Sequence, residues 1–270
     1  MSSLSVPGAV IDFNLRGQDA SGPAVVQLHG LTSSRERDRT LGLDLGRGLA
    51  MDGTQDGAPR VLRYDARGHG RSTGRLVADD YRWDRLAEGL LLLLDHVFPG
   101  EPVHGVGPSM GTGTLLNAAA ARPDRFHALT LAVPPTAWES RRVQALTYED
   151  QAVLIEHHGV EAFIALGDEA VPPPAAAAAP HTVPDVSESL LPTLLRGAAM
   201  ADFPAREVLS SLTLPTLLLA WTDDPTHPLS TAEELHGLLG NSHLVVASSP
   251  ADIDEWPDLL ASHVSQTLPA

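Results

Sequence analysis

One serine in this sequence lies between glycines in a way that suits a nucleophile. The run Gly107-Pro108-Ser109-Met110-Gly111 has the pattern G-x-S-x-G and stands between an apolar run and a stretch of helical period. In a sharp turn from a strand into a helix, side chains two residues either side of the serine would collide, so glycine fits there. The turn lifts the Ser109 hydroxyl above the sheet, and the helix start favours developing negative charge. The pattern therefore predicts a nucleophilic serine.

Negative charge that develops on a substrate oxygen needs N–H donors, and two are expected near this serine. Met110 supplies one, directly after Ser109. The other comes from the turn His29-Gly30-Leu31, which ends an early apolar run. Together the Leu31 and Met110 N–H groups would hold the tetrahedral oxyanion, with Gly30 lining the same site. We expect the His29 side chain to organise this turn and to take no part in proton transfer.

The segments that carry these residues alternate between two patterns. Helical periods cover residues 81–97, 110–121, 231–239 and 256–268, and apolar runs typical of buried strands cover residues 24–30, 60–65, 103–107, 126–133, 215–221 and 243–247. Such alternation predicts an α/β fold with a mainly parallel sheet that helices cover on both faces.

Residues 136–206 break this alternation, because they contain helical pieces and no convincing strand. The strand pattern resumes after them, so we predict one core made of residues 1–135 and 207–270, with 136–206 inserted as a helical cap or lid. A low-complexity stretch, residues 171–180, is typical of a flexible or extended proline-rich hinge. Trp138, Phe163 and Met200 are expected either to face the substrate or to form the core of the cap.

Several motifs follow one another in a fixed order: His29-Gly30, then YDARGHGRS at residues 64–72, then the serine turn, then TDDP at residues 222–225. This order resembles the α/β-hydrolase superfamily, and most of all its cap-bearing branch of lipase/esterase-like and enol-lactonase-like proteins. The resemblance implies that residues 65–72, with His69, are structural. It also implies a carboxylate after the strand that follows the cap, which would orient and charge-stabilise an imidazole. Here Asp224 matches that position, with Asp223 as the competing choice.

The histidine that the resemblance implies is missing from its usual place. In that family it follows the last strand, yet no histidine occurs from Leu244 to Ser262. The base could instead have moved to His227, three residues after Asp224, where an imidazole could reach Ser109 directly or through water. The protein would then be a serine hydrolase of small esters, thioesters or lactones that works through an acyl-enzyme.

Two alternatives to a relocated base stay open. The fold could lack a working triad and serve small-molecule binding, or lyase or cyclase chemistry, instead of hydrolysis. A different histidine could also act as the base. The candidates are His157, His158 and His181 in the predicted cap, His243 before the last strand, and His263 in the final helix.

Composition narrows the partners and cofactors. The 270 residues carry a formal net charge of −16, which argues against nucleic acid or an anionic membrane surface as partner. Cysteine is absent and all 18 basic residues are arginine, so thiolate, Schiff-base and Walker-type phosphate chemistry are excluded. No metal-binding pattern of histidines occurs. We expect an enzyme without metal or cofactor that acts on a small acyl substrate in the cytoplasm, with no signal peptide in residues 1–10.

Overall fold

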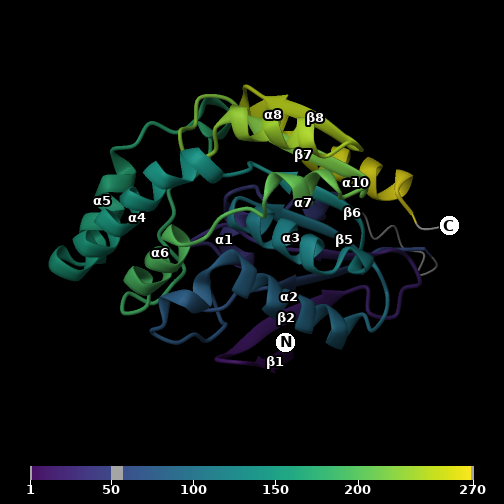
Figure 1. Ribbon diagram of the computed structural model, residues 1–270, viewed down its shortest axis with the longest axis horizontal. Helices are drawn as coiled ribbons and strands as arrows, with labels where there is room; N and C mark the ends of the chain where they lie inside the picture. The colour runs from purple at the N-terminus through teal and green to yellow at the C-terminus, as the bar shows by residue number, and fades with distance from the viewer. Residues whose placement is uncertain (1, 50–56, 269–270) are drawn as a thin grey trace.

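The computed structural model describes residues 2–49 and 57–268 and contains an eight-stranded sheet (Figure 1). Along the sheet the strands lie in the order β1-β2-β4-β3-β5-β6-β7-β8. Their bounds are β1 Ser2–Val6, β2 Ala9–Arg16, β3 Ala24–Gln27, β4 Arg60–Tyr64, β5 Val103–Pro108, β6 Phe126–Ala132, β7 Thr216–Trp221 and β8 Ser242–Ala247. β2 runs antiparallel to both β1 and β4, whereas all the other neighbours are parallel. The predicted α/β fold with a mainly parallel sheet is therefore confirmed.

Helices cover both faces of this sheet. One face carries α2 (Trp83–Val97), α3 (Met110–Ala121) and α8 (Leu229–Leu238), and the other carries η1 (Leu45–Gly48) and α10 (Trp256–Gln266). Val26 of β3 is buried in one apolar cluster with α2 and α3, whereas its neighbour Val25 is buried in a second cluster with α10. Because consecutive strand residues point to opposite faces, the two clusters are the two halves of the core. Among the described residues, none of the helices is both long and apolar enough to cross a bilayer.

The N-terminal hairpin differs from the sequence analysis, which predicts no strand before residue 24. β1 and β2 pair there, with Val6 opposite Ala9 across a two-residue turn. Gly8 in that turn has φ +79°, a left-handed conformation that glycine adopts without strain. In β2, Ile11 and Phe13 are buried and alternate with less buried polar residues, which is the period of two expected for a strand.

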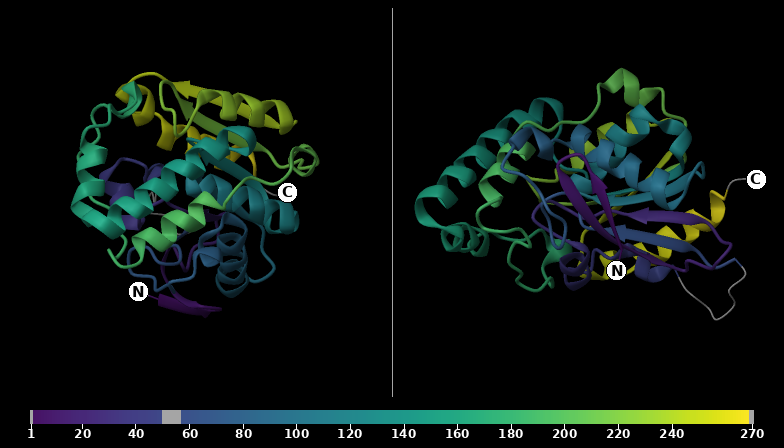
Figure 2. Two further views of the ribbon diagram at one scale, coloured as in Figure 1. Left: turned by 60° about the vertical axis from the view of Figure 1, so that its left-hand side comes forward. Right: turned by 90° about the horizontal axis from the view of Figure 1, so that it is seen from below.

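Between β6 and β7 the regular elements are all helices, and most of them project beyond one end of the sheet (Figures 1 and 2). They are α4 (Trp138–His158), α5 (Val160–Asp168), η4 (Pro174–Ala176), α6 (Leu191–Ala199) and α7 (Arg206–Ser210). We call residues 136–206 the cap segment; its boundaries remain a prediction. Leu191 and Leu195 of α6 are buried with Ala152 and Ile155 of α4, so this segment has a small core of its own.

The proline-rich stretch of the cap segment is partly packed. Ala175, in η4, is buried in the same cluster as Trp221 at the end of β7 and Trp256 of α10. A tight helical turn with a buried residue differs from the extended or flexible hinge that composition alone suggests.

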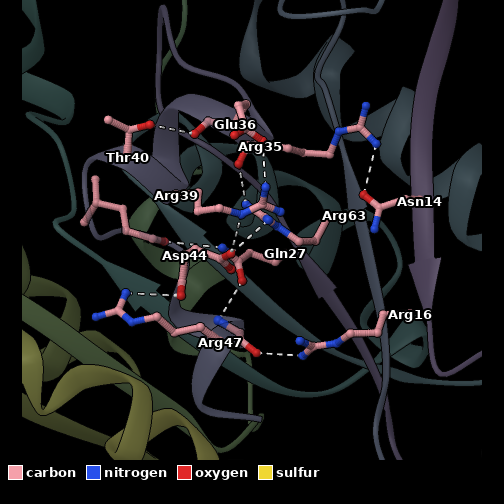
Figure 3. A network of polar contacts seen from close by, with 12 residues as sticks. Asn14, Arg16, Gln27, Arg35, Glu36, Arg39, Thr40, Asp44, Arg47 and Arg63 are labelled. Atoms are coloured by element: carbon pink, nitrogen blue, oxygen red, sulfur yellow. Dashed lines mark hydrogen bonds and ion pairs between the residues drawn. The ribbon is translucent and has the colours of Figure 1, made fainter. Parts of the chain in front are cut away.

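A polar network fixes the chain that follows β3 (Figure 3). Gln27, the last residue of β3, accepts a hydrogen bond from the Gly46 N–H (2.8 Å). Arg63 of β4 donates to the Asp44 carboxylate (2.9 Å) and to the Arg35 carbonyl oxygen (2.7 Å). Arg35 begins α1 (Arg35–Thr40). The loop at residues 28–34, between β3 and α1, is therefore held at both ends.

Candidate active site

Ser109 occupies a strained turn between β5 and α3. Its backbone has φ 52° and ψ −113°, which a residue other than glycine rarely adopts. A Cβ on Gly107 would lie 2.8 Å from the main-chain carbonyl carbon of Gly111, and one on Gly111 would lie 3.0 Å from the Leu28 Cβ. The glycines of the sequence motif are therefore required by space, and the turn is the sharp strand-to-helix turn that the motif predicts.

An imidazole lies next to the hydroxyl of this serine. His227 Nε2 is 2.8 Å from Ser109 Oγ, and His227 Nδ1 is 2.7 Å from Asp224 Oδ2. Asp224 and His227 both belong to the loop that connects β7 to α8. With Nδ1–H donating to Asp224, Nε2 is free to accept the hydroxyl proton of Ser109. The structure thus brings together the three residues singled out as nucleophile, base and acid.

Asp224 is held by several donors besides the imidazole. Its Oδ2 accepts from the Trp221 indole N–H (2.9 Å), and its Oδ1 accepts from the Thr226 hydroxyl (2.6 Å) and the Thr226 N–H (2.8 Å). Burial alone would raise the pKa of this carboxyl, but the hydrogen bond and charge of His227 outweigh it and hold the pKa well below its usual range. The carboxylate therefore stays ionised and keeps the imidazole oriented.

The other candidate residues lie elsewhere. Asp223 is exposed and has φ +60°, and no hydrogen bond links it to the imidazole. His243 is exposed on β8, and His181 pairs with Asp168 in the cap segment. His263 packs against the buried His104, and His157 and His158 end α4 on its exposed side. Within residues 2–49 and 57–268, His227 is the histidine that hydrogen-bonds Ser109.

The turn after β3 passes beside Ser109. A Cβ on Gly30 would lie 3.7 Å from the Ser109 Cβ, so the main chain at Gly30 and Leu31 borders the reacting hydroxyl. Met110 is the first residue of α3, so its N–H has no partner within the helix. Both proposed oxyanion donors therefore border the site, and their role stays a prediction.

The two histidines near this turn are buried and neutral. His29 Nε2 accepts from the Ala66 N–H (2.8 Å), which leaves Nδ1–H to donate to the Gly30 carbonyl oxygen (2.8 Å). His69 lies with its ring centroid 4.9 Å from that of His29. Burial, and then the neighbouring His29, lowers the pKa of His69 to about 3. These contacts fit the structural roles expected of both residues.

The three cap residues named in the sequence analysis lie in different surroundings. Trp138 packs edge-on against Phe203, and Met200 is exposed. Phe163 of α5 lines a cavity of about 580 Å³ between the cap segment and the loop after β3.

Among the described residues, no three histidine, aspartate or glutamate side chains are grouped so that they could hold a metal ion.

Comparison with known proteins agrees with this architecture. Residues 23–252 match the family described as alpha/beta hydrolase fold. The chain belongs to the α/β-hydrolase fold family. It is 31% identical to RutD, a candidate carbamate hydrolase of Pseudomonas syringae pv. syringae, over 69% of this chain and 73% of that protein. It is 26% identical to 3-oxoadipate enol-lactonase 1 of Acinetobacter baylyi, over 73% and 74% respectively.

A solved enol-lactonase structure from Burkholderia xenovorans superposes with a TM-score of 0.75 at 18% identity, covering 98% of this chain and 100% of that one. At that identity the likeness concerns the fold. Together with the family match, it confirms the resemblance to the α/β-hydrolase superfamily.

In this α/β-hydrolase chain, the position after β8 holds a helix cap and no imidazole. Ser249 precedes α9 (Pro250–Asp254), and Asp252 Oδ2 accepts from the N–H groups of Ser248 (2.8 Å) and Ser249 (2.9 Å). The polar groups of the loop after β8 are thus hydrogen-bonded within that loop. The imidazole that contacts Ser109 comes from the preceding strand's loop instead.

Trp221 is a site residue that sequence reasoning misses. It ends the apolar run of β7, so it reads as buried strand, and its ring does stack on that of Trp256. The same indole donates to Asp224 and lies edge-on to the His227 ring, with the centroids 5.9 Å apart. A polar partner for a buried tryptophan is expected in general, but its identity follows only from the fold.

Proposed function

We propose that this chain is a serine hydrolase that cleaves small esters, thioesters or lactones through an acyl-enzyme. The observation that carries the proposal is the hydrogen-bonded path from Ser109 Oγ to His227 (2.8 Å) and on to Asp224 (2.7 Å). A serine hydroxyl becomes an effective nucleophile when an oriented base can take its proton during attack.

In the proposed reaction, Ser109 Oγ bonds to the substrate carbonyl carbon while His227 Nε2 takes the hydroxyl proton. The Leu31 and Met110 N–H groups hold the resulting oxyanion. The intermediate collapses as the bond to the leaving oxygen or sulfur breaks, and His227 returns the proton to that atom. Water then attacks the acyl-enzyme with the same proton transfers and releases the acid and Ser109.

The relatives support the reaction class. The names of RutD and of the Acinetobacter enzyme give a carbamate and an enol lactone as substrates. Both are carbonyl compounds whose hydrolysis can begin with attack at the carbonyl carbon, which is the step proposed here for Ser109.

A fluorophosphonate probe tests the proposal, because it labels a serine only when that serine is activated. We expect labelling of the wild type and loss of labelling in Ser109→Ala and His227→Ala. His243→Ala is the matched control, since this exposed imidazole on β8 lies away from the site. Circular dichroism of each variant would show that the fold is retained.

Two results would contradict the proposal. A folded wild type that takes up no probe would favour the alternative of ligand binding, or of lyase or cyclase chemistry, without a working triad. Full labelling of His227→Ala would mean that another group activates Ser109.

A further inference from the structure

One arginine of α1, which contacts the chain just after the proposed oxyanion turn, differs from its neighbours on that helix in having no carboxylate partner. Arg37 of α1 donates from Nε to the Thr182 hydroxyl (2.9 Å) and from Nη1 to the Thr32 carbonyl and hydroxyl oxygens (both 3.0 Å). These acceptors are all neutral. Arg35 and Arg39, on the same helix, are each paired with carboxylates.

Nothing in the part of the chain that the structure describes neutralises Arg37 directly. No carboxylate oxygen there lies within 4.0 Å of its guanidinium nitrogens, and its Nη2 group has no hydrogen-bond acceptor. The negative charges that act on it from further away belong to Asp38 and Asp185. Burial raises the pKa of Asp38 to about 7, so near neutral pH this carboxyl carries only part of a charge. An arginine remains charged in such surroundings.

The guanidinium faces a cavity large enough for a small molecule. Arg37 lines the cavity of about 580 Å³ together with apolar side chains of α5, namely Phe163, Ile164 and Leu166. Two carboxylates also border it from the cap segment: Asp168, which pairs with His181 (2.5 Å), and Glu169, which is exposed. The unpaired cation therefore lies on the sheet side, and the apolar wall lies on the cap side.

The cavity begins next to the proposed oxyanion turn. Thr32 lines it and directly follows Leu31, while Gly30 borders Ser109. Thr32 has φ +58°, a strained conformation for a β-branched residue. Its carbonyl oxygen is held by Arg37 and by the Asp185 N–H (2.8 Å). Thr32 thus connects the cavity wall at Arg37 to the turn beside Ser109, and a substrate that uses both must span from that turn to Arg37.

We propose that Arg37 binds a free carboxylate on the substrate, so that the preferred esters, thioesters or lactones are those that carry one. A partly buried guanidinium without a carboxylate partner binds a carboxylate through charge-assisted hydrogen bonds, and Nη2 has both of its N–H groups available. The apolar wall suits a short aliphatic chain between that carboxylate and the reacting carbonyl. This inference rests on the proposed function of Ser109.

A matched pair of esters tests the inference. Mono-p-nitrophenyl glutarate carries a free carboxylate, and p-nitrophenyl methyl glutarate has the same chain with that charge removed. We expect the wild type to favour the first roughly 10- to 100-fold in kcat/KM, the range for one charge-assisted contact. Arg37→Met should remove the preference by slowing the charged ester alone, whereas Arg37→Lys should keep part of it.

The two variants separate recognition from a structural role. Equal losses on both esters in Arg37→Met would mean that Arg37 only holds the Thr32 turn, and would overturn the inference. Arg39→Met is the control, since it removes an exposed arginine of the same helix that is paired with Glu36 and does not line the cavity, and it should keep the preference. A wild type that hydrolyses both esters equally would also overturn the inference.

A binding measurement distinguishes this inference from the function on which it rests. Glutarate alone should bind Ser109→Ala in calorimetry, and binding should disappear in the double variant Ser109→Ala/Arg37→Met. If neither ester is hydrolysed but glutarate still binds through Arg37, the serine-hydrolase proposal fails and the carboxylate site stands. If glutarate does not bind Ser109→Ala, the carboxylate site fails.

Discussion

The two aspartates before Pro225 differ in backbone conformation, and this difference decides which of them reaches the imidazole. Asp223 adopts φ +60° and points to solvent, whereas Asp224 turns inward to meet Trp221, Thr226 and His227. Sequence alone leaves both choices open, because adjacent aspartates before a proline suit a turn equally well.

Exchanging each aspartate for its amide tests this assignment. Asp224→Asn should lower kcat on p-nitrophenyl acetate by about 100-fold or more, because an amide no longer charge-stabilises the imidazolium or fixes its tautomer. Asp223→Asn should change kcat by less than about 3-fold. Comparable losses in the two variants would show that the loop as a whole matters and that Asp224 has no special role.

Gly107, two residues before Ser109, should not tolerate a larger side chain. Gly107→Ala would place a Cβ 2.8 Å from the main chain of Gly111, so we expect a loss of about 1–3 kcal/mol in the free energy of unfolding. Gly237→Ala is the control, because nothing lies within 4 Å of a Cβ in that position on α8. It should be neutral or stabilise by about 0.5–1 kcal/mol. Urea unfolding would measure both, and an unaffected Gly107→Ala would argue against so close an approach of the two main-chain segments.

At the scale of elements, the cap segment is joined to the core by a buried arginine on α4. Arg141 donates to the carbonyl oxygens of Ala198 (2.7 Å) and Ala201 (2.9 Å), and its guanidinium lies 4.2 Å from the centre of the Trp83 ring on α2. The side chain therefore links α4, the end of α6 and α2, and fixes how the first cap helix leaves the sheet.

Its neighbour in sequence provides a matched comparison. Arg141→Met should lower the free energy of unfolding by about 2–4 kcal/mol, because two buried carbonyl groups lose their donor and the cation–π contact is lost. Arg142→Met, at an exposed position, should stay within about 0.5 kcal/mol of the wild type. Chemical denaturation would measure the difference, and equal stabilities would remove Arg141 as an anchor.

The elements also show how far sequence patterns reach. The parallel strands and the serine turn follow from apolar runs and from the glycines around Ser109, because these patterns are local. The N-terminal hairpin has a weaker sequence pattern, because its strands are half exposed and contain no continuous apolar run. Arg141 is buried and Arg142 is exposed, because of the face that α4 turns toward the core. The sequence does not predict this difference, since α4 has no clear apolar face. The contact between His227 and Ser109 spans 118 residues, and local patterns leave it as one of three explanations for the histidine missing after the last strand.

For the molecule as a whole, buried neutral histidines link stability to pH. Burial lowers the pKa of His69 to about 3 and also lowers the pKa of His29 and of His104. In the unfolded chain each titrates near about 6.5, so below that pH the unfolded state binds protons that the folded state does not. Asp38 acts in the opposite direction, because its folded pKa is raised to about 7.

Acidification should therefore destabilise the protein. As the pH falls below about 6.5, His69 lowers the free energy of unfolding by up to about 1.4 kcal/mol per pH unit down to about pH 3, and His104 and His29 act in the same direction. Three histidines outweigh the single opposing carboxyl. Urea unfolding at pH 7.5, 6.0 and 5.0 would measure the slope. His69→Gln should reduce it, the exposed His236→Gln should not, and a stability that rises on acidification would contradict the account.

His227 and Asp224 both lie in the loop after β7. β7 is an interior strand between β6 and β8, whereas β8 is an edge strand of the sheet. An edge strand is hydrogen-bonded to the sheet on one side only, so it opens locally more readily than an interior strand. If the imidazole were attached to the edge strand, each local opening of that strand would separate it from the Ser109 hydroxyl. Here β8 and the loop after it can loosen without breaking the contacts among Ser109, His227 and Asp224, whereas α10 supports the site, because its Trp256 stacks on the Trp221 that donates to Asp224.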